Sequence, residues 1–84
     1  MSYSLGKTYF LIWYNDDPTV ETLLGDVLVN TYGFTKDETH KCFYILADGF
    51  DEEAILEYFE EQGYFDVNMY FWDYLNSYQV PGQV

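Results

Sequence analysis

The fold is decided by a short apolar and aromatic run near the start of the chain, Thr8-Tyr9-Phe10-Leu11-Ile12-Trp13-Tyr14. Runs of this length, rich in aromatic and β-branched residues, favour a strand that is buried on both faces or nearly so. The run stops at Asn15-Asp16-Asp17-Pro18, a cluster typical of a turn. The sequence therefore predicts a central strand over residues 8–14.

A helix is predicted directly after this strand. Asp17 is a good cap for its N-terminus, with Pro18 at the first helical position. Gly33 stands where the helix is expected to end. The side chains expected on its buried stripe follow helical spacing, and they are Val20, Leu23, Leu24, Val27, Leu28 and Thr31.

Residues 35–48 allow two interpretations. Thr35 and Glu38 match a capping box, which indicates a helix that ends at Gly49. The compact run Cys42-Phe43-Tyr44-Ile45-Leu46 instead consists of residues that favour strands, and the polar segment 34–41 is then a loop leading into it. We favour the strand.

The stretch from Asp48 to Glu61 combines acidic and aromatic residues on one predicted helix. Asp51 is a good N-cap, acidic residues fill the first turn, and Gly63 marks the C-terminal stop. One buried stripe is indicated by the spacing of Ala54, Ile55, Tyr58 and Phe59. The opposite side then carries a row of carboxylates, those of Glu53, Glu57, Glu60 and Glu61.

The last apolar segment, residues 64–78, is also ambiguous. Residues 65, 67, 69 and 71 alternate as in a strand, whereas Val67, Phe71, Tyr74, Leu75 and Tyr78 follow a helical stripe from a cap at Asp66. The length favours a helix over 66–78, packed on the sheet, and residues 79–84 are expected to be a frayed tail. The prediction is one α+β domain over residues 1–84, with a short sheet and two or three helices in the order β-α-β-α-α.

Composition sets limits on function. The 84 residues are enough for one small domain, and 49% hydrophobic and 23% aromatic residues supply a dense core. Fifteen acidic residues against three lysines give a net charge of −12, and no basic side chain follows Lys41. Such a surface lacks the basic footprint of a nucleic-acid binder and is repelled by anionic membranes. The natural partner is a basic protein or a cation.

Neither catalysis nor a bound metal is indicated. His40 is the only histidine and Cys42 the only cysteine, and we interpret them as a surface histidine beside a buried cysteine. The acids from Asp48 to Glu61 lack the spacing of a calcium-binding loop. We therefore expect no enzymatic activity, no metal and no cofactor. With neither an apolar leader at residues 1–7 nor a membrane-spanning run, a cytoplasmic location is expected.

The start of the chain resembles ClpS, the family of adaptors that deliver N-degron substrates to the Clp protease. The residues that carry the resemblance are Asn15-Asp16-Asp17, Thr19, Val27-Leu28 and Gly33, within the first half of the chain. The resemblance implies that Asn15 and Asp16 hold the α-amino group of a substrate. The chain departs from the family at two pocket positions, because the family's histidine falls near Ala47 and its methionine falls on Glu21.

A second resemblance concerns the general type of protein and not a sequence motif. Carboxylates four residues apart on a helix lie about 6 Å from each other, close to the spacing of phosphates along a nucleic-acid strand. In size, acidity and aromatic content the chain is similar to bacteriophage DNA-mimic inhibitors, which occupy the DNA-binding surface of host proteins such as HU, nucleases or RNA polymerase. Alternatives are the ClpS-like adaptor and a small acidic structural or interaction domain whose charged helix is only a solvated face.

The residues expected to contact a basic partner belong to the two predicted helix starts, the carboxylate row and the aromatic segment after it. They are Asp16, Asp17, Glu21, Asp51, Glu52, Glu53, Glu57, Glu60, Glu61, Asp66, Tyr70 and Trp72. The first three assist only if the two helix starts face the same side. A homodimer would lengthen the negative face.

Overall fold

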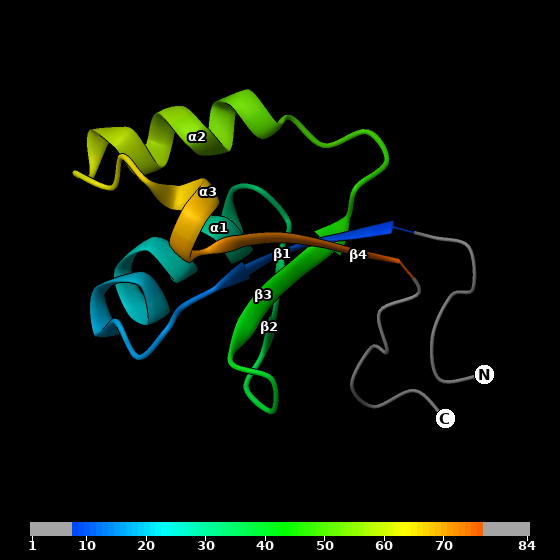
Figure 1. Ribbon diagram of the computed structural model, residues 1–84, viewed down its shortest axis with the longest axis horizontal. Helices are drawn as coiled ribbons and strands as arrows, with labels where there is room; N and C mark the ends of the chain where they lie inside the picture. Colours follow the sequence, from blue (N-terminus) through cyan, green and yellow to red (C-terminus); the bar gives the residue numbers. More distant parts are fainter. Residues whose placement is uncertain (1–7, 77–84) are drawn as a thin grey trace.

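The computed structural model describes residues 8–76, which form an antiparallel four-stranded sheet and helices on one of its faces (Figure 1). The strands are β1 (Thr8–Trp13), β2 (Thr35–Asp37), β3 (Cys42–Leu46) and β4 (Trp72–Asn76), in the spatial order β2-β3-β1-β4. The helices are a π-helical turn η1 (Val20–Leu24) that continues into α1 (Gly25–Asn30), then α2 (Glu52–Glu61) and the short α3 (Val67–Tyr70). The predicted α+β class is confirmed.

Strand β1 is central, as predicted. It pairs antiparallel with β3 on one edge and with β4 on the other, so that its backbone has hydrogen-bonding neighbours on both sides. Phe10, Leu11 and Ile12 are 0% exposed. Burying side chains of this size stabilises the fold by about 1.5–3 kcal/mol each.

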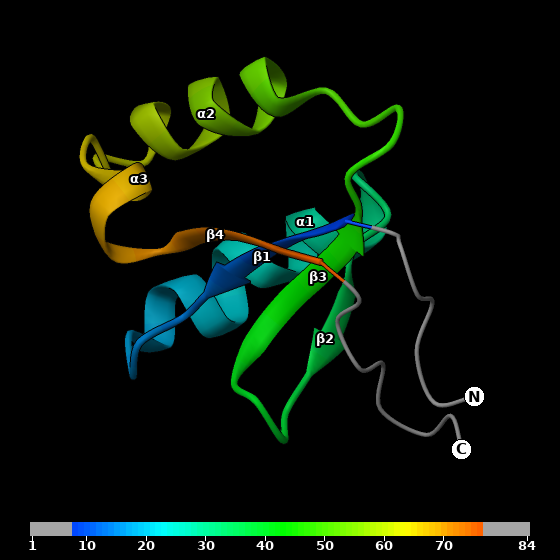
Figure 2. The same cartoon turned by 45° about the vertical axis from the view of Figure 1, so that its right-hand side comes forward.

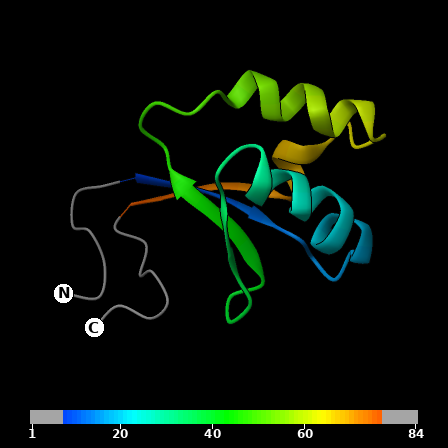
Figure 3. The same ribbon diagram turned by 180° about the vertical axis from the view of Figure 1, so that it is seen from behind.

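The two faces of the sheet bury different sets of residues. Phe10 and Ile12 share one core cluster with buried residues of η1, α1 and α2, so they point to the face on which the helices lie. Figure 3 shows the helices and the sheet from behind. The main core forms there between the sheet and the helices, and its other buried members are Tyr14, Val20, Leu24, Leu28, Phe34, Phe43, Ile55, Phe59 and Val67. On the opposite face, Tyr9, Leu11 and Cys42 form a smaller buried cluster.

The first helical segment starts where the sequence predicts but buries a narrower stripe. Asp17 Oδ1 accepts hydrogen bonds from the backbone N–H groups of Thr19 and Val20 (2.9 and 3.3 Å). The fully buried apolar side chains recur every four residues, at Val20, Leu24 and Leu28. Leu23, expected in the stripe, is 67% exposed, and Thr31 is also exposed. The wider π-helical turn explains the exposure of Leu23, because i→i+5 bonding places more residues in each turn than an α-helix does and rotates the residue three positions after Val20 away from the buried face.

The segment after the helix is a hairpin. The strand preferred for residues 42–46 is confirmed as β3, but the expected loop over 34–41 contains β2, which pairs antiparallel with β3. Asp37 Oδ1 accepts a hydrogen bond from the backbone N–H of His40 (3.1 Å) in the turn between them. A polar edge strand of three residues has no apolar alternation, so its sequence carries no strand signal.

The predicted helix over 66–78 is wrong. A single helical turn, α3, is followed by β4, and the Trp13 N–H donates to the Phe71 carbonyl (2.6 Å) where α3 meets the sheet. The physical reason is that a buried strand leaves no backbone N–H or C=O unpaired, and β1 requires a partner on its second edge. The observed order is β-α-β-β-α-α-β. Tyr78 and the frayed tail predicted for 79–84 lie outside the described residues.

We predict that Gly25→Ala destabilises the domain. A Cβ at Gly25 would overlap the ring of Phe43, which is 1% exposed and has no room to move. Overpacking of this kind costs about 1–3 kcal/mol, whereas alanine alone would favour a helix by about 1 kcal/mol over glycine. Urea denaturation measures the change in the free energy of unfolding and so decides its sign. The control is Asp26→Ala at the exposed neighbouring position. A stabilised Gly25→Ala variant would show that α1 and β3 are not in close contact.

Candidate functional site

Helix α2 is built as the sequence predicts. Asp51 is its N-cap, and Asp51 Oδ1 accepts a hydrogen bond from the backbone N–H of Ala54 (3.2 Å). Ile55 and Phe59 are 1% and 0% exposed and bind the helix to the core. Gly63 follows the helix with a φ of 91°, a backbone conformation that glycine adopts without strain.

The outer side of α2 is an uncompensated row of carboxylates. All four predicted members are exposed, and we call Glu53, Glu57, Glu60 and Glu61 the acidic face. Within residues 8–76, the ion pairs involve Lys36, His40 and Lys41, and none of them reaches α2. The last turn of α2 contains no basic residue.

The two acids at the start of α2 serve the fold. Asp51 caps the helix, and the Glu52 carboxylate is hydrogen-bonded to the Tyr74 hydroxyl of β4. Burial, followed by this hydrogen bond and the charge of Glu52, raises the pKa of Tyr74 to about 12. Asp51 thus caps α2 and Glu52 links its first turn to β4, although both were expected to contact a partner.

The carboxylates of Glu21 and Asp16, both expected to contact a basic partner, have cationic partners within the domain. Glu21 Oε2 lies 3.7 Å from Lys36 Nζ, and Lys36 also lies 3.9 Å from Glu38 Oε1. Asp16 Oδ1 lies 3.7 Å from Lys41 Nζ. Exposed pairs at these distances contribute about 0–1 kcal/mol, so they neutralise the surface locally and add little stability.

The two helix starts do not face the same side. In Figures 1 and 2, α2 begins above the middle of the sheet and ends on the side where β1 ends and η1 begins. Two hydrogen bonds join the C-terminal end of α2 and the segment after it to the β1–η1 turn. The Tyr64 hydroxyl donates to Asp17 Oδ2 (3.0 Å), and the Asn15 side-chain amide donates to the Tyr70 carbonyl.

We call the exposed carboxylates of Glu60, Glu61 and Asp66, which stand on either side of Tyr64 in the sequence, the acidic corner. Asp17, in contrast, is half-buried, and both of its oxygens are used within the fold, by the N-terminus of the helix and by Tyr64. The charges thus gather where one helix ends and the other begins, because β4 turns back along β1 and places α3 beside the β1–η1 turn.

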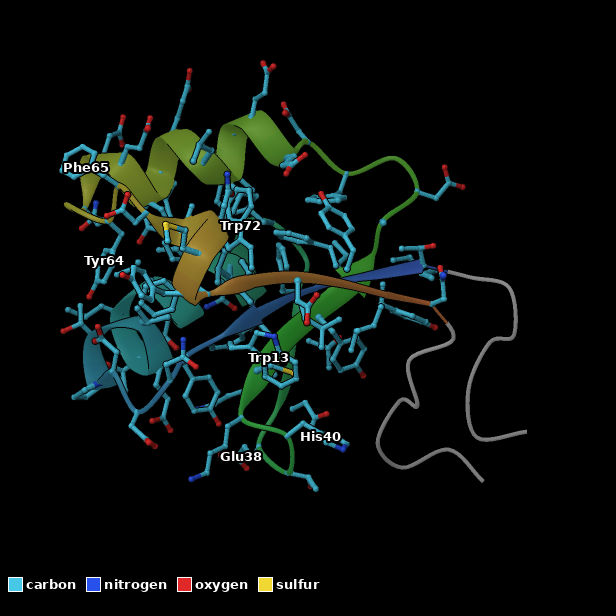
Figure 4. The ribbon with its side chains drawn as sticks, in the orientation of Figure 1. Trp13, Glu38, His40, Tyr64, Phe65 and Trp72 are labelled. Atoms are coloured by element: carbon cyan, nitrogen blue, oxygen red, sulfur yellow. The ribbon has the colours of Figure 1, made fainter. Side chains whose placement is uncertain are left out.

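Of the two aromatic residues expected to flank the carboxylates, only Tyr70 lies at the surface. Tyr70 is 60% exposed. The Trp72 ring points inward (Figure 4) and packs against Phe10, with ring centroids 4.9 Å apart, and against Phe59 at 6.5 Å. Trp72 is therefore a core residue, because alternation along β4 turns it toward the helices.

Two exposed apolar residues at this corner were not among the expected contacts. Phe65 is 71% exposed and Met69 is 77% exposed. Figure 4 shows Phe65 beyond the end of α2, pointing away from the sheet. The sequence pattern placed both in a packed segment, and only the polar neighbours Asp66 and Asn68 in the same segment signalled exposure.

His40 and Cys42 adopt the predicted arrangement. The side chain of His40 is 48% exposed, with Nδ1 2.6 Å from Asp37 Oδ2, while Cys42 is buried on the sheet. Among the described residues 8–76, no three His, Cys, Asp or Glu side chains are grouped so as to hold a metal ion. In the same part of the chain, no helix has both the length and the apolar character needed to cross a membrane.

No match to the chain was found among protein-family models, curated proteins or solved structures. A functional assignment therefore depends on the acidic face, the acidic corner and the exposed residues beside them. The ClpS-like and DNA-mimic resemblances both stay predictions.

We predict that Tyr64→Phe loosens the corner and changes the alkaline stability profile. Burial, and after it the hydrogen bond to Asp17, raises the pKa of Tyr64 above its ordinary value of about 10. Above pH 10 the folded state retains a proton that the unfolded chain has lost, so the free energy of unfolding falls as the pH rises. Without this group the decline above pH 10 is shallower, and at pH 7 the lost hydrogen bond costs about 1 kcal/mol.

Urea denaturation at several pH values from 7 to 11 measures both effects. Tyr70→Phe, which removes a hydroxyl from an exposed ring of the same corner, is the matched control and should behave as the parent. Superimposable curves for Tyr64→Phe and the parent would show that the Tyr64–Asp17 contact does not hold the corner together.

Proposed function

We propose that the protein is a non-enzymatic acidic inhibitor that mimics DNA and occupies the DNA-binding surface of a basic protein. The observation that carries the proposal is the acidic face of α2. Four exposed carboxylates lie there with no cation paired to them among the described residues, although Lys36 and Lys41 pair with carboxylates elsewhere.

The arrangement of charge on α2 opposes the stability of the helix. Glu57 is four residues from both Glu53 and Glu61, and like charges at this spacing destabilise a helix by about 0.2–0.5 kcal/mol per pair. Glu60 and Glu61 also lie at the C-terminal end, where the helix dipole disfavours negative charge. A surface arranged only for solubility would mix its signs. The unfavourable arrangement supports a role in which an external partner supplies the missing cations.

A basic DNA-binding groove provides such cations. The ten residues of α2 span about 15 Å, and successive carboxylates about 6 Å apart present negative charge at a spacing similar to that of DNA phosphates. Binding would release the counterions of the partner's Lys and Arg side chains, so that affinity depends steeply on salt. The inhibitor acts by occupancy and needs no catalytic group.

The proposed partner is a bacterial DNA-binding protein, such as an HU-like nucleoid protein, a nuclease or RNA polymerase, and the proposed source is a bacteriophage. This part of the proposal is supported by the resemblance in size, acidity and aromatic content. In the ClpS-like alternative, Asn15 and Asp16 would instead hold the α-amino group of a substrate. Asn15 already donates to the Tyr70 carbonyl, and Asp16 is paired with Lys41.

We predict that the protein displaces a fluorescent DNA duplex from at least one of three purified targets, namely an HU-like protein, a restriction nuclease and RNA polymerase. Changing the acidic face by Glu53→Gln, Glu57→Gln, Glu60→Gln and Glu61→Gln should weaken competition about tenfold or more, since each exposed pair contributes about 0.2–1 kcal/mol. The dependence of affinity on salt should become shallower. Fluorescence anisotropy at two salt concentrations measures both.

The matched control removes four charges elsewhere on the surface, by Asp26→Asn, Glu38→Gln, Asp48→Asn and Asp73→Asn, all at exposed positions outside α2. It should compete nearly as well as the parent, with circular dichroism verifying the fold of both variants. An equal loss of competition in the two quadruple variants would show that the effect depends only on net charge. No displacement from any of the three targets by the parent would contradict the proposed function, and tight binding of a peptide with a bulky N-terminal residue would favour the adaptor.

A further inference from the structure

Three large apolar side chains lie exposed within six residues at the end of α2. They are Phe65, Met69 and Tyr70, with exposures of 71%, 77% and 60%, and we call them the apolar corner patch. Single exposed apolar side chains are ordinary on protein surfaces, but three in one short segment indicate a candidate interaction site. Phe, Tyr and Met are also enriched in protein interfaces.

The backbone that carries this patch is held in place from both ends. At one end, the Tyr64 ring packs against Phe59 and Phe71, and its hydroxyl donates to Asp17 (3.0 Å). In the middle, Val67 is 1% exposed and anchors α3 in the core. At the other end the Asn15 side chain donates to the Tyr70 carbonyl. The patch is therefore presented on a fixed scaffold, which lowers the entropy lost when a partner binds.

The surroundings of the patch are negative. Glu60 and Glu61 precede it at the end of α2, and Asp66 lies within it. Apolar side chains surrounded by carboxylates are complementary to a partner surface in which an apolar side chain is surrounded by Lys or Arg. A second copy of the chain, with a net charge of −12, would instead place carboxylates against carboxylates.

We propose that the apolar corner patch is the anchor for an apolar side chain of the basic partner, with the acidic corner contacting the cations around it. This inference rests on the proposed function and refines it. The acidic face supplies long-range attraction and salt dependence, whereas the patch supplies the desolvated contact that slows dissociation. The partner is therefore a protein segment with both basic and apolar residues, and not one that is basic alone.

The test uses two synthetic peptides of equal length and charge, one with alternating Lys and Leu blocks that form an amphipathic helix and one in which every Leu is replaced by Ser. The full chain should bind the Lys/Leu peptide at least tenfold more tightly than the Lys/Ser peptide by fluorescence anisotropy. The double variant Phe65→Ala/Met69→Ala should lose this preference while still binding the Lys/Ser peptide as the parent does. Both side chains are mostly exposed, so folding is little affected.

The matched control is Leu46→Ala, which truncates an exposed apolar residue paired with Tyr9 at the opposite end of the sheet, and it should keep the preference. Equal affinity of the parent for the two peptides, or a preference that survives in the double variant, would overturn the inference while leaving the proposed function intact. Dimerisation of the parent that the double variant abolishes, measured by sedimentation, would assign the patch to self-association instead. Failure of the parent to displace DNA from any target concerns the proposed function and is measured separately.

Discussion

A strand that is apolar on both faces must be covered on both sides and paired on both edges, and β1 imposes this requirement on the whole chain. Phe10 and Ile12 are covered by the helices, while β3 and β4 satisfy the two edges. Because β4 runs antiparallel to β1, the turn before it lies beside the end of β1. The C-terminal end of α2 is thereby brought to the β1–η1 turn. The position of the acidic corner is therefore a consequence of how the two edges of the central strand are paired.

The fold separates two kinds of carboxylate. Asp17, Asp37, Asp51 and Glu52 accept hydrogen bonds that cap helices, close the hairpin or fix α2 on β4. The acidic face has no such role among the described contacts. The aromatic core is the source of stability that allows the domain to tolerate like charges on one helix, because buried Phe and Ile side chains each contribute several times what one like-charge pair costs. The charge of the acidic face is thus a property that the fold permits without using.

Local chemistry made part of this structure predictable from the sequence. The continuous apolar run of β1, the Asp17 and Asp51 caps and the amphipathic stripe of α2 each carry their own signal, and so does the exposure of the acidic face. Strands β2 and β4 could not be predicted, since an edge strand of three polar residues and a strand with a helix-compatible pattern are defined by their partners. Likewise, the contacts of Tyr64 with Asp17 and of Asn15 with Tyr70 join residues 47 and 55 positions apart, and no local pattern encodes them.

The carboxylates of the acidic face oppose the fold to which they are attached. The most direct test of this claim is the free energy of unfolding of Glu57→Lys, measured by urea denaturation at low and high salt. The introduced ammonium group would lie four residues from both Glu53 and Glu61, replacing two repulsive pairs by two attractive ones. We expect a stabilisation of about 1–2 kcal/mol at low salt that shrinks at high salt. A destabilised variant would contradict the claim, because it would show that the Glu57 carboxylate contributes to the folded domain.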